Sequence, residues 1–137
     1  GGMSAGKLPY AGIRVVEFTH MVMGPTCGMV LADLGAEVIK VEPIEGDRTR
    51  RLLGAGAGFF PMFNRNKKSI ALDLQQPAGR EAARRLIAPA DVVSENFRPG
   101  TMQKLGLDYA ANGELPVYFR LLHALVAEAI AHVERSL

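Results

Sequence analysis

Short apolar runs separated by polar loops occupy most of the first hundred residues. A β-branched run at residues 13–18 and a second at residues 37–42 predict two strands. Between them, Pro25 suits the first position of a helix, and Gly35 suits the left-handed position that follows one. A strand, a helix and a strand in this order predict a βαβ unit with a parallel pair of strands.

The same alternation continues further along the chain. Apolar residues at every second position of residues 69–74 predict a third strand, and a helix is expected over residues 77–87. Residues 92–93 predict a short fourth strand, and residues 99–106 a short helix. Residues 46–66 are rich in glycine and predict a mobile loop or a weak helix.

The pattern changes after residue 109. Residues 110–113 form a turn-like break, and from Val117 to Val133 the apolar residues recur at helical spacing. The chain therefore predicts an α/β fold, with a parallel sheet, flanking helices and a closing C-terminal helix. The broad apolar stripe of that last helix needs a covering surface, which makes a partner chain plausible.

Composition narrows the class of protein. Of 137 residues, 48% are hydrophobic and 22% are charged, which excludes a disordered chain. The net charge of +2 gives no reason to expect a nucleic-acid partner. The single cysteine excludes an internal disulfide, and no apolar run reaches the roughly 20 residues of a membrane span. The start of the chain lacks a signal-peptide pattern, so we expect a cytoplasmic protein with no membrane partner.

The first candidate site is the loop at residues 19–25, which joins a strand to the start of a helix. Ligands bind at that edge of parallel sheets, although the loop lacks a GxGxxG motif and also fits a plain connection. His20 could be a general acid or base, but a capping or packing role is favoured. Cys27 lies close to the helix N-terminus, yet it shares a face with apolar residues and fits a buried thiol better.

Two further segments carry polar groups of interest. A basic stretch predicts either anion binding or a solvated loop, and consists of Arg48, Arg50, Arg51, Arg65, Lys67 and Lys68. Asn96, Phe97 and Arg98 follow a strand and could meet a base, or act as a helix cap and a core residue. His123 and His132 lie nine residues apart, which is not metal-ligand spacing, so we expect no metal.

Several motifs follow one another in order: GIRVVEF at 12–18, GP at 24–25, LADLGAEVIKVEP at 31–43, NKKSIALDL at 66–74, ADV at 90–92, ENFRPG at 95–100 and KLGLDY at 104–109. Together they resemble the amino-terminal part of the family III CoA-transferases, the CaiB/BaiF family. The resemblance covers about residues 8–109 and is specific, because separate motifs keep their order and spacing. The family includes formyl-, succinyl- and carnitine-CoA transferases and α-methylacyl-CoA racemases.

This resemblance implies a Rossmann-like, CoA-binding domain at residues 1–109 and a helical segment at residues 110–137 that departs from the family pattern. It implies coenzyme A or an acyl-CoA as ligand, and two interlocked chains, so we expect a homodimer or a complementing chain. The residues that it implies for CoA binding are Met21, Val22, Met23 and Pro43 at strand ends, Leu72, Leu74, Asn96 and Phe97 around the adenine, and Lys104 with Leu105 near the phosphates.

The resemblance ends before the region that carries the family's catalytic aspartate, and no residue of this chain matches that position. We therefore assign no catalytic residue and expect the CoA-binding portion of a transferase or racemase, truncated or rearranged and inactive alone. Two alternatives remain. One is an interaction or dimerisation module derived from the same fold, and the other is a small nucleotide-binding protein that shares only the fold.

Overall fold

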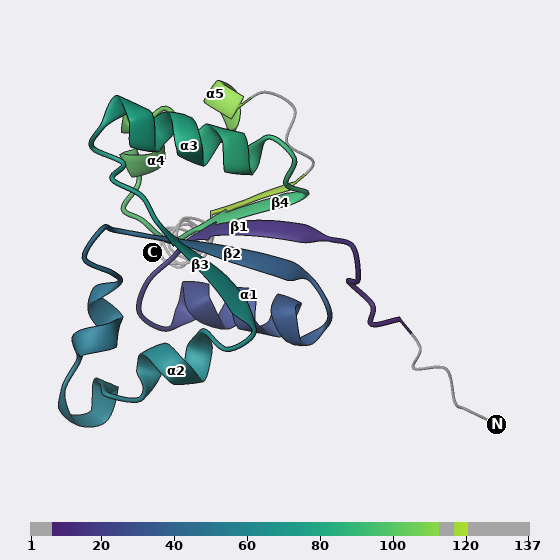
Figure 1. Ribbon diagram of the computed structural model, residues 1–137, viewed down its shortest axis with the longest axis vertical. Helices are drawn as coiled ribbons and strands as arrows, with labels where there is room; N and C mark the ends of the chain where they lie inside the picture. The colour runs from purple at the N-terminus through teal and green to yellow at the C-terminus, as the bar shows by residue number, and fades with distance from the viewer. Residues whose placement is uncertain (1–6, 113–116, 121–137) are drawn as a thin grey trace, which may run out of the picture.

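The protein folds as a parallel five-stranded sheet with helices on both faces (Figure 1). The computed structural model describes residues 7–112 and 117–120. The strand order is β3-β2-β1-β4-β5, and each neighbouring pair is parallel. The strands are β1 (Arg14–Phe18), β2 (Glu37–Glu42), β3 (Lys67–Ala71), β4 (Val92–Glu95) and β5 (Val117–Arg120). The α/β class expected from the sequence is confirmed.

Each face of the sheet is covered by its own helices, with α1 and α2 on one side and α3, α4 and α5 on the other (Figure 1). The helices are α1 (Met23–Asp33), α2 (Phe59–Phe63), α3 (Pro77–Ile87), α4 (Thr101–Lys104) and α5 (Tyr109–Asn112). Two short 3-10 turns, η1 (Arg48–Arg51) and η2 (Gly54–Gly56), precede α2. None of the helices in the described residues has the length and apolar character to cross a membrane.

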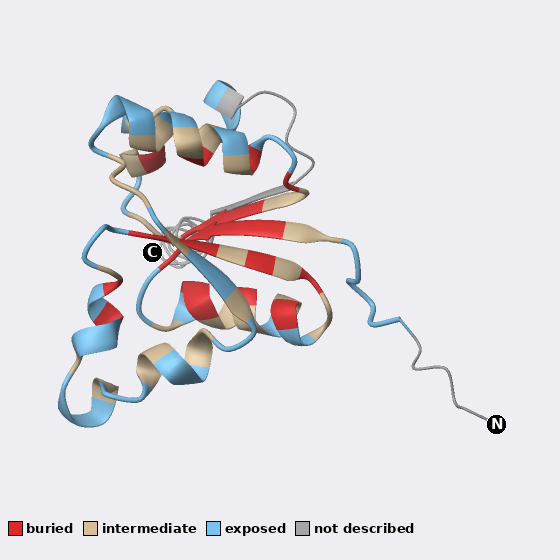
Figure 2. Ribbon diagram, viewed as in Figure 1, coloured by how far each residue is buried: buried red, intermediate tan, exposed pale blue. Residues whose placement is uncertain are grey.

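Buried residues concentrate on β1, β2 and β4, the central strands of the sheet (Figure 2). On the α3 face, Phe18 and Val93 pack with Ile87 of α3 in one apolar cluster. On the α1 face, Val15 and Val38 form a smaller cluster with α1. Burial of apolar area at both faces is the main force that holds the helices to the sheet.

The α1 face also buries charge. Glu17 of β1 is fully buried, and its Oε1 lies 2.7 Å from the Nζ of Lys67, whose side chain is 2% exposed. Gly28 of α1 leaves room for this pair, since a Cβ at that position would lie 2.1 Å from Glu17 Oε2. The absence of a side chain at Gly28 therefore lets α1 pack directly over the buried carboxylate.

Most predicted elements of the first hundred residues are present, with shifted ends. The third strand begins at Lys67 and ends at Ala71, earlier than expected at both ends. Pairing extends one step further, because Leu72 N donates to Glu42 O at 2.9 Å, and Asp73 then begins the turn into α3. The segment at residues 46–66, predicted as a mobile loop or weak helix, contains η1, η2 and α2.

The helix predicted to start at Val117 is wrong over its first four residues. Val117–Arg120 form β5, which pairs in parallel with the outer edge of β4. The cause is tertiary, because the open edge of β4 offers backbone partners that the local helical period does not reveal. Residues 121–133 of the predicted helix lie outside the described residues. A domain boundary at residue 109 stays a prediction, and β5 adds to the same sheet.

Candidate functional site

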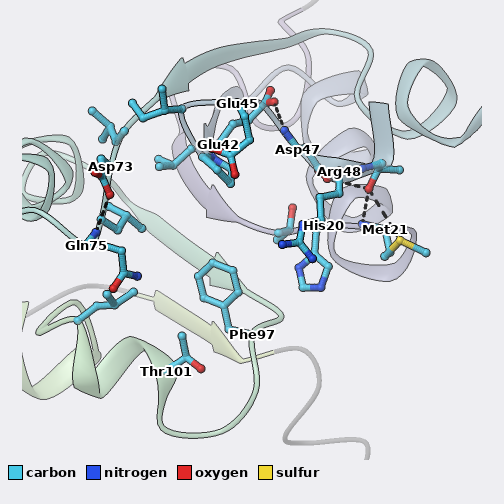
Figure 3. A pocket seen from close by; sticks show the side chains of 18 residues that line it. His20, Met21, Glu42, Glu45, Asp47, Arg48, Asp73, Gln75, Phe97 and Thr101 are labelled. Carbon is cyan, nitrogen blue, oxygen red and sulfur yellow. Dashed lines mark hydrogen bonds between the residues drawn. The ribbon is translucent and has the colours of Figure 1, made fainter. Parts of the chain in front are cut away.

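A cleft of about 820 Å³ lies at the carboxyl edge of the sheet (Figure 3). Its lining comes from the segments that follow β1, β2, β3 and β4, together with η1 and α4. The chain passes from β1 to β2 and β3 on one side, and then to β4 on the other side of β1. The cleft therefore opens at the point where the strand order reverses, which is where open α/β sheets bind ligands.

Two rings stand on the two sides of this reversal point. His20 follows β1 and Phe97 follows β4, and their rings stack with centroids 6.1 Å apart (Figure 3). Both residues line the cleft. In the described part of the chain, no hydrogen bond joins the His20 ring to a carboxylate. His20 is exposed, and the packing role favoured for it from the sequence stays a prediction.

The loop between β1 and α1 is held by Asn96. The Asn96 side chain accepts a hydrogen bond from His20 N at 3.0 Å and donates one to His20 O at 2.9 Å. Gly24 allows the close fit, because a Cβ there would lie 2.7 Å from Thr19 Cβ and 3.0 Å from Asn96 Cγ. Both polar groups of the Asn96 amide are thus engaged by the backbone of the loop.

A second set of contacts ties the same loop to η1. Met21 has a left-handed backbone, with φ of 67°, and its N–H donates to Thr49 Oγ1 at 3.1 Å. Thr49 in turn donates from N and Oγ1 to Asp47 Oδ1, at 2.9 and 2.8 Å. This network fixes a backbone conformation that a non-glycine residue adopts only at a cost.

The Asp47 carboxylate is buried beside Lys40. Lys40 Nζ lies 3.1 Å from Asp47 Oδ2 and donates to Thr19 O at 2.5 Å, and both side chains are almost fully buried. Burial opposes ionisation of Asp47, but the hydrogen bonds from Thr49 and the charge of Lys40 outweigh it and hold the pKa below its usual range. Lys40, on β2, therefore joins the residue that follows β1 to the start of η1.

Glu42, at the end of β2, is the other strongly held carboxylate. It accepts hydrogen bonds from Arg50 Nε and Nη2 at 2.8 and 2.7 Å, from Ser69 Oγ at 2.6 Å and from Asp47 N at 2.8 Å. Arg50 also lies over the Phe60 ring, 3.7 Å from its centroid. Burial of Glu42 acts against ionisation, but these hydrogen bonds and the charge of Arg50 prevail and lower its pKa from 4.5 to about 2.

We expect acid to weaken the fold through Glu42. Because its folded pKa is depressed, its stabilising contribution is complete above pH 4.5 and is lost as the pH falls from there towards about 2. Arg50 is 43% exposed, so screening reduces the effect to about 1–2 kcal/mol of unfolding free energy. Urea unfolding of wild type and Glu42→Gln across this pH range measures it. A wild-type stability no more dependent on pH than that of the variant contradicts the expectation.

The residues expected at the ligand site divide into two groups. Six line the cleft: Met21, Pro43, Leu72, Leu74, Phe97 and Leu105. The other four lie outside its lining. Val22 is the residue before α1, Met23 is the first residue of α1, Lys104 is exposed at the end of α4, and Asn96 holds the loop as described above.

Sequence patterns did not point to several residues of this region. Lys40, Asp47 and Thr49 form the buried network, and Glu42 is held by Arg50, yet the sequence showed only the residue types and none of these pairings. A GDxTR segment at residues 46–50, a few residues after a strand, was the available signal, since Asp is a strong N-cap residue. Its partners come from β2 and the β1–α1 loop, which no local pattern specifies.

Most of the basic stretch has carboxylate partners. Arg50, Arg65, Lys67 and Lys68 pair with Glu42, Asp33, Glu17 and Glu37, and Arg51 donates to the Glu45 carbonyl. Cys27 is half-buried, and burial raises the pKa of its thiol, with the charge of Glu17 acting in the same direction. The described residues contain no group of three potential metal ligands, and His123 and His132 lie outside them.

The chain is similar to a set of known proteins over most of its length. Residues 10–115 match the family model described as CoA-transferase family III. A formyl-CoA:oxalate CoA-transferase of Afipia carboxidovorans is 46% identical over 103 residues, which cover 72% of this chain and 24% of that protein. A probable fatty acyl-CoA transferase of Mycobacterium tuberculosis, Rv3272, is 44% identical over 122 residues, covering 82% of this chain and 31% of that protein.

Solved structures agree with these matches. The orthorhombic crystal structure of the M. tuberculosis protein has a TM-score of 0.77 and 45% identity, and the match covers 82% of this chain and 32% of that one. A CaiB/BaiF family protein from Brucella suis has a TM-score of 0.71 and 46% identity, covering 77% of this chain and 30% of that one. The chain spans between 24% and 31% of the length of the two curated relatives.

Proposed function

The chain belongs to CoA-transferase family III, and we propose that its cleft binds the nucleotide part of coenzyme A or of an acyl-CoA. The observation that carries the proposal is the cleft itself. It lies at the reversal point of the sheet, and six of the residues expected at a CoA site line it. Its volume falls within the usual range for small-molecule sites.

The lining fits the chemistry of an adenine nucleotide. Leu72, Leu74 and Phe97 form an apolar surface, and the Phe97 ring offers a flat face to a base. Thr101 and Gln75 add groups that can donate and accept hydrogen bonds. Asn96 supports this site by holding the β1–α1 loop, and we assign it a positioning role instead of contact with the adenine.

We propose that these 137 residues bind CoA without catalysing acyl transfer or racemisation. Transfer through a carboxylate needs a nucleophilic oxygen that is free to attack. In the cleft, the oxygens of Glu42 and Asp47 are occupied by Arg50, Ser69, Lys40 and Thr49, and the depressed pKa of each makes it a weak nucleophile. Glu45 and Asp73 also line the cleft, but the family resemblance assigns a catalytic role to neither position. For the whole protein we propose transfer of CoA between carboxylic acids or acyl-CoA racemisation, in a cytoplasmic homodimer or with a complementing chain.

A non-enzymatic interaction or dimerisation module is the second candidate. Exposed apolar side chains on the α1 and α2 side favour it, among them Val30, Leu53 and Met62. The two proposals differ in one measurable property, which is affinity for CoA.

Calorimetric titration of the full chain with CoA tests the proposed function. We expect saturable one-to-one binding by the wild type. Phe97→Ala should weaken it about tenfold through loss of stacking, and Asn96→Ala should weaken it by releasing the loop. Phe63→Ala is the matched control, because Phe63 is also partly buried but packs against Phe59 outside the cleft.

Each result has a definite meaning. Absence of binding by a folded wild type contradicts the proposal and favours the interaction module. If wild type, Phe97→Ala and Asn96→Ala bind CoA with equal affinity, the CoA site does not lie in this cleft. Turnover of an acyl-CoA and a carboxylic acid by the purified chain contradicts binding without catalysis.

A further inference from the structure

Arg48 differs from the other arginines of its turn. Arg50 is paired with Glu42, and Arg51 donates to the Glu45 carbonyl. Arg48 lines the cleft (Figure 3), is exposed, and has neither a hydrogen bond nor an ion pair within the part of the chain that the structure describes. Its guanidinium therefore keeps its donors available to a molecule that enters the cleft.

The backbone that carries Arg48 is held on both sides. Asp47 before it and Thr49 after it are both buried, and Asp47 caps η1 through Thr49 N. The Lys40–Asp47 ion pair fixes this turn to β2, and Thr49 Oγ1 fixes it to Met21. A cationic group on an anchored turn loses little backbone freedom when it binds, which favours recognition over a merely solvated charge.

The charges around Arg48 make it the main source of attraction for an anionic ligand in the cleft. Among the described residues that line the cleft, Arg48 is the only lysine or arginine. Glu42 and Asp47 are neutralised by Arg50 and Lys40, whereas Glu45 and Asp73 also line the cleft and would repel an anion. An anionic ligand in this cleft is therefore attracted by Arg48 and opposed by Glu45 and Asp73.

We infer that Arg48 binds a ribose-linked phosphate of the CoA nucleotide and selects phosphorylated ligands at this cleft. The inference rests on the proposed function. The guanidinium is planar and forked, a shape that binds two phosphate oxygens at once. The phosphate is either the 3′-phosphate or the diphosphate, which share this chemistry.

The experiment compares wild type, Arg48→Gln and Arg48→Lys in calorimetric titrations with CoA and with 3′-dephospho-CoA. Arg48→Gln should lower CoA affinity about tenfold, the size of one charge-assisted hydrogen bond. The CoA affinity of Arg48→Lys should lie between those of wild type and Arg48→Gln, because lysine keeps the charge but lacks the forked guanidinium. Arg85→Gln, an exposed arginine on α3 outside the cleft, removes the same charge and should leave the affinity unchanged.

The second ligand identifies the phosphate. If the difference between wild type and Arg48→Gln disappears with 3′-dephospho-CoA, Arg48 binds the 3′-phosphate. If the difference persists, Arg48 binds the diphosphate, and either result supports the inference. Equal CoA affinity of wild type and Arg48→Gln overturns it while leaving the proposed function in place. A folded wild type that does not bind CoA overturns both.

Discussion

Lys67→Met should destabilise the protein by about 3–5 kcal/mol, because it removes the ion-pair partner of the buried Glu17 carboxylate. Burial already raises the Glu17 pKa, while the nearby Lys67 charge lowers it. Without Lys67 the carboxylate must take up a proton or remain charged in an apolar interior, and either change costs free energy. The measurement is urea unfolding near neutral pH, compared with wild type.

Two further variants distinguish loss of the buried Glu17–Lys67 ion pair from loss of a lysine charge alone. Lys68→Met changes the next residue of β3, which pairs with Glu37 at the surface and is 71% exposed, so we expect a loss below about 1 kcal/mol. The double variant Glu17→Gln with Lys67→Met removes both buried charges and should be more stable than Lys67→Met alone. A double variant no more stable than Lys67→Met would show that the lost charge pairing is not the cause.

Gly79→Ala should destabilise the protein by about 1–3 kcal/mol, although alanine favours helices by about 1 kcal/mol over glycine. Gly79 lies in α3, and a Cβ there would be 1.9 Å from Asp73 O and 2.6 Å from Asp73 C. Both are backbone atoms, so the segment that carries Leu72, Asp73 and Leu74 must move. These three residues line the cleft, and affinity for CoA should fall together with stability.

Gly58→Ala provides the control for this second variant. A Cβ at Gly58, the residue before α2, meets no atom within 4 Å, so the same substitution should be neutral or raise stability by about 0.4–1 kcal/mol. Urea unfolding and a CoA titration of both variants test the pair. If Gly79→Ala is more stable than wild type, the close approach of α3 to Asp73 is relieved at little cost, and our explanation is wrong.

The sequence was sufficient to predict the alternating strands and helices of the first hundred residues. Residues 13–18 and 37–42 are β-branched runs that carry their own preference, and Pro25, Gly35 and Pro77 mark helix ends through backbone restrictions that are local. The family resemblance, and not the strand pattern, placed Met21, Pro43, Leu72 and Phe97 at one ligand site, and the structure brings these four residues to one cleft at the edge where the parallel strands end.

Only the tertiary structure decided which polar groups pair. Lys67 and Arg50 belonged to a basic stretch that fitted anion binding or a solvated loop, and both are engaged by buried carboxylates, Glu17 of β1 and Glu42 of β2. The same holds for Asn96, whose amide engages the loop after β1 across 76 positions of sequence. Which polar side chains pair depends on the distances between helices and strands in the fold, and a single sequence does not contain those distances.

Residues 117–120 show the same difference between what the sequence predicts and what the tertiary structure decides. The helical spacing of apolar residues from Val117 was a local signal, but the edge of β4 accepted Val117–Arg120 as a strand. The sequence pattern showed that this segment has apolar side chains to bury, because the hydrophobicity of a side chain follows from its residue type. The sheet edge decided their backbone conformation, because the N–H and C=O groups on the edge of β4 pair with the backbone of Val117–Arg120 when that segment is extended.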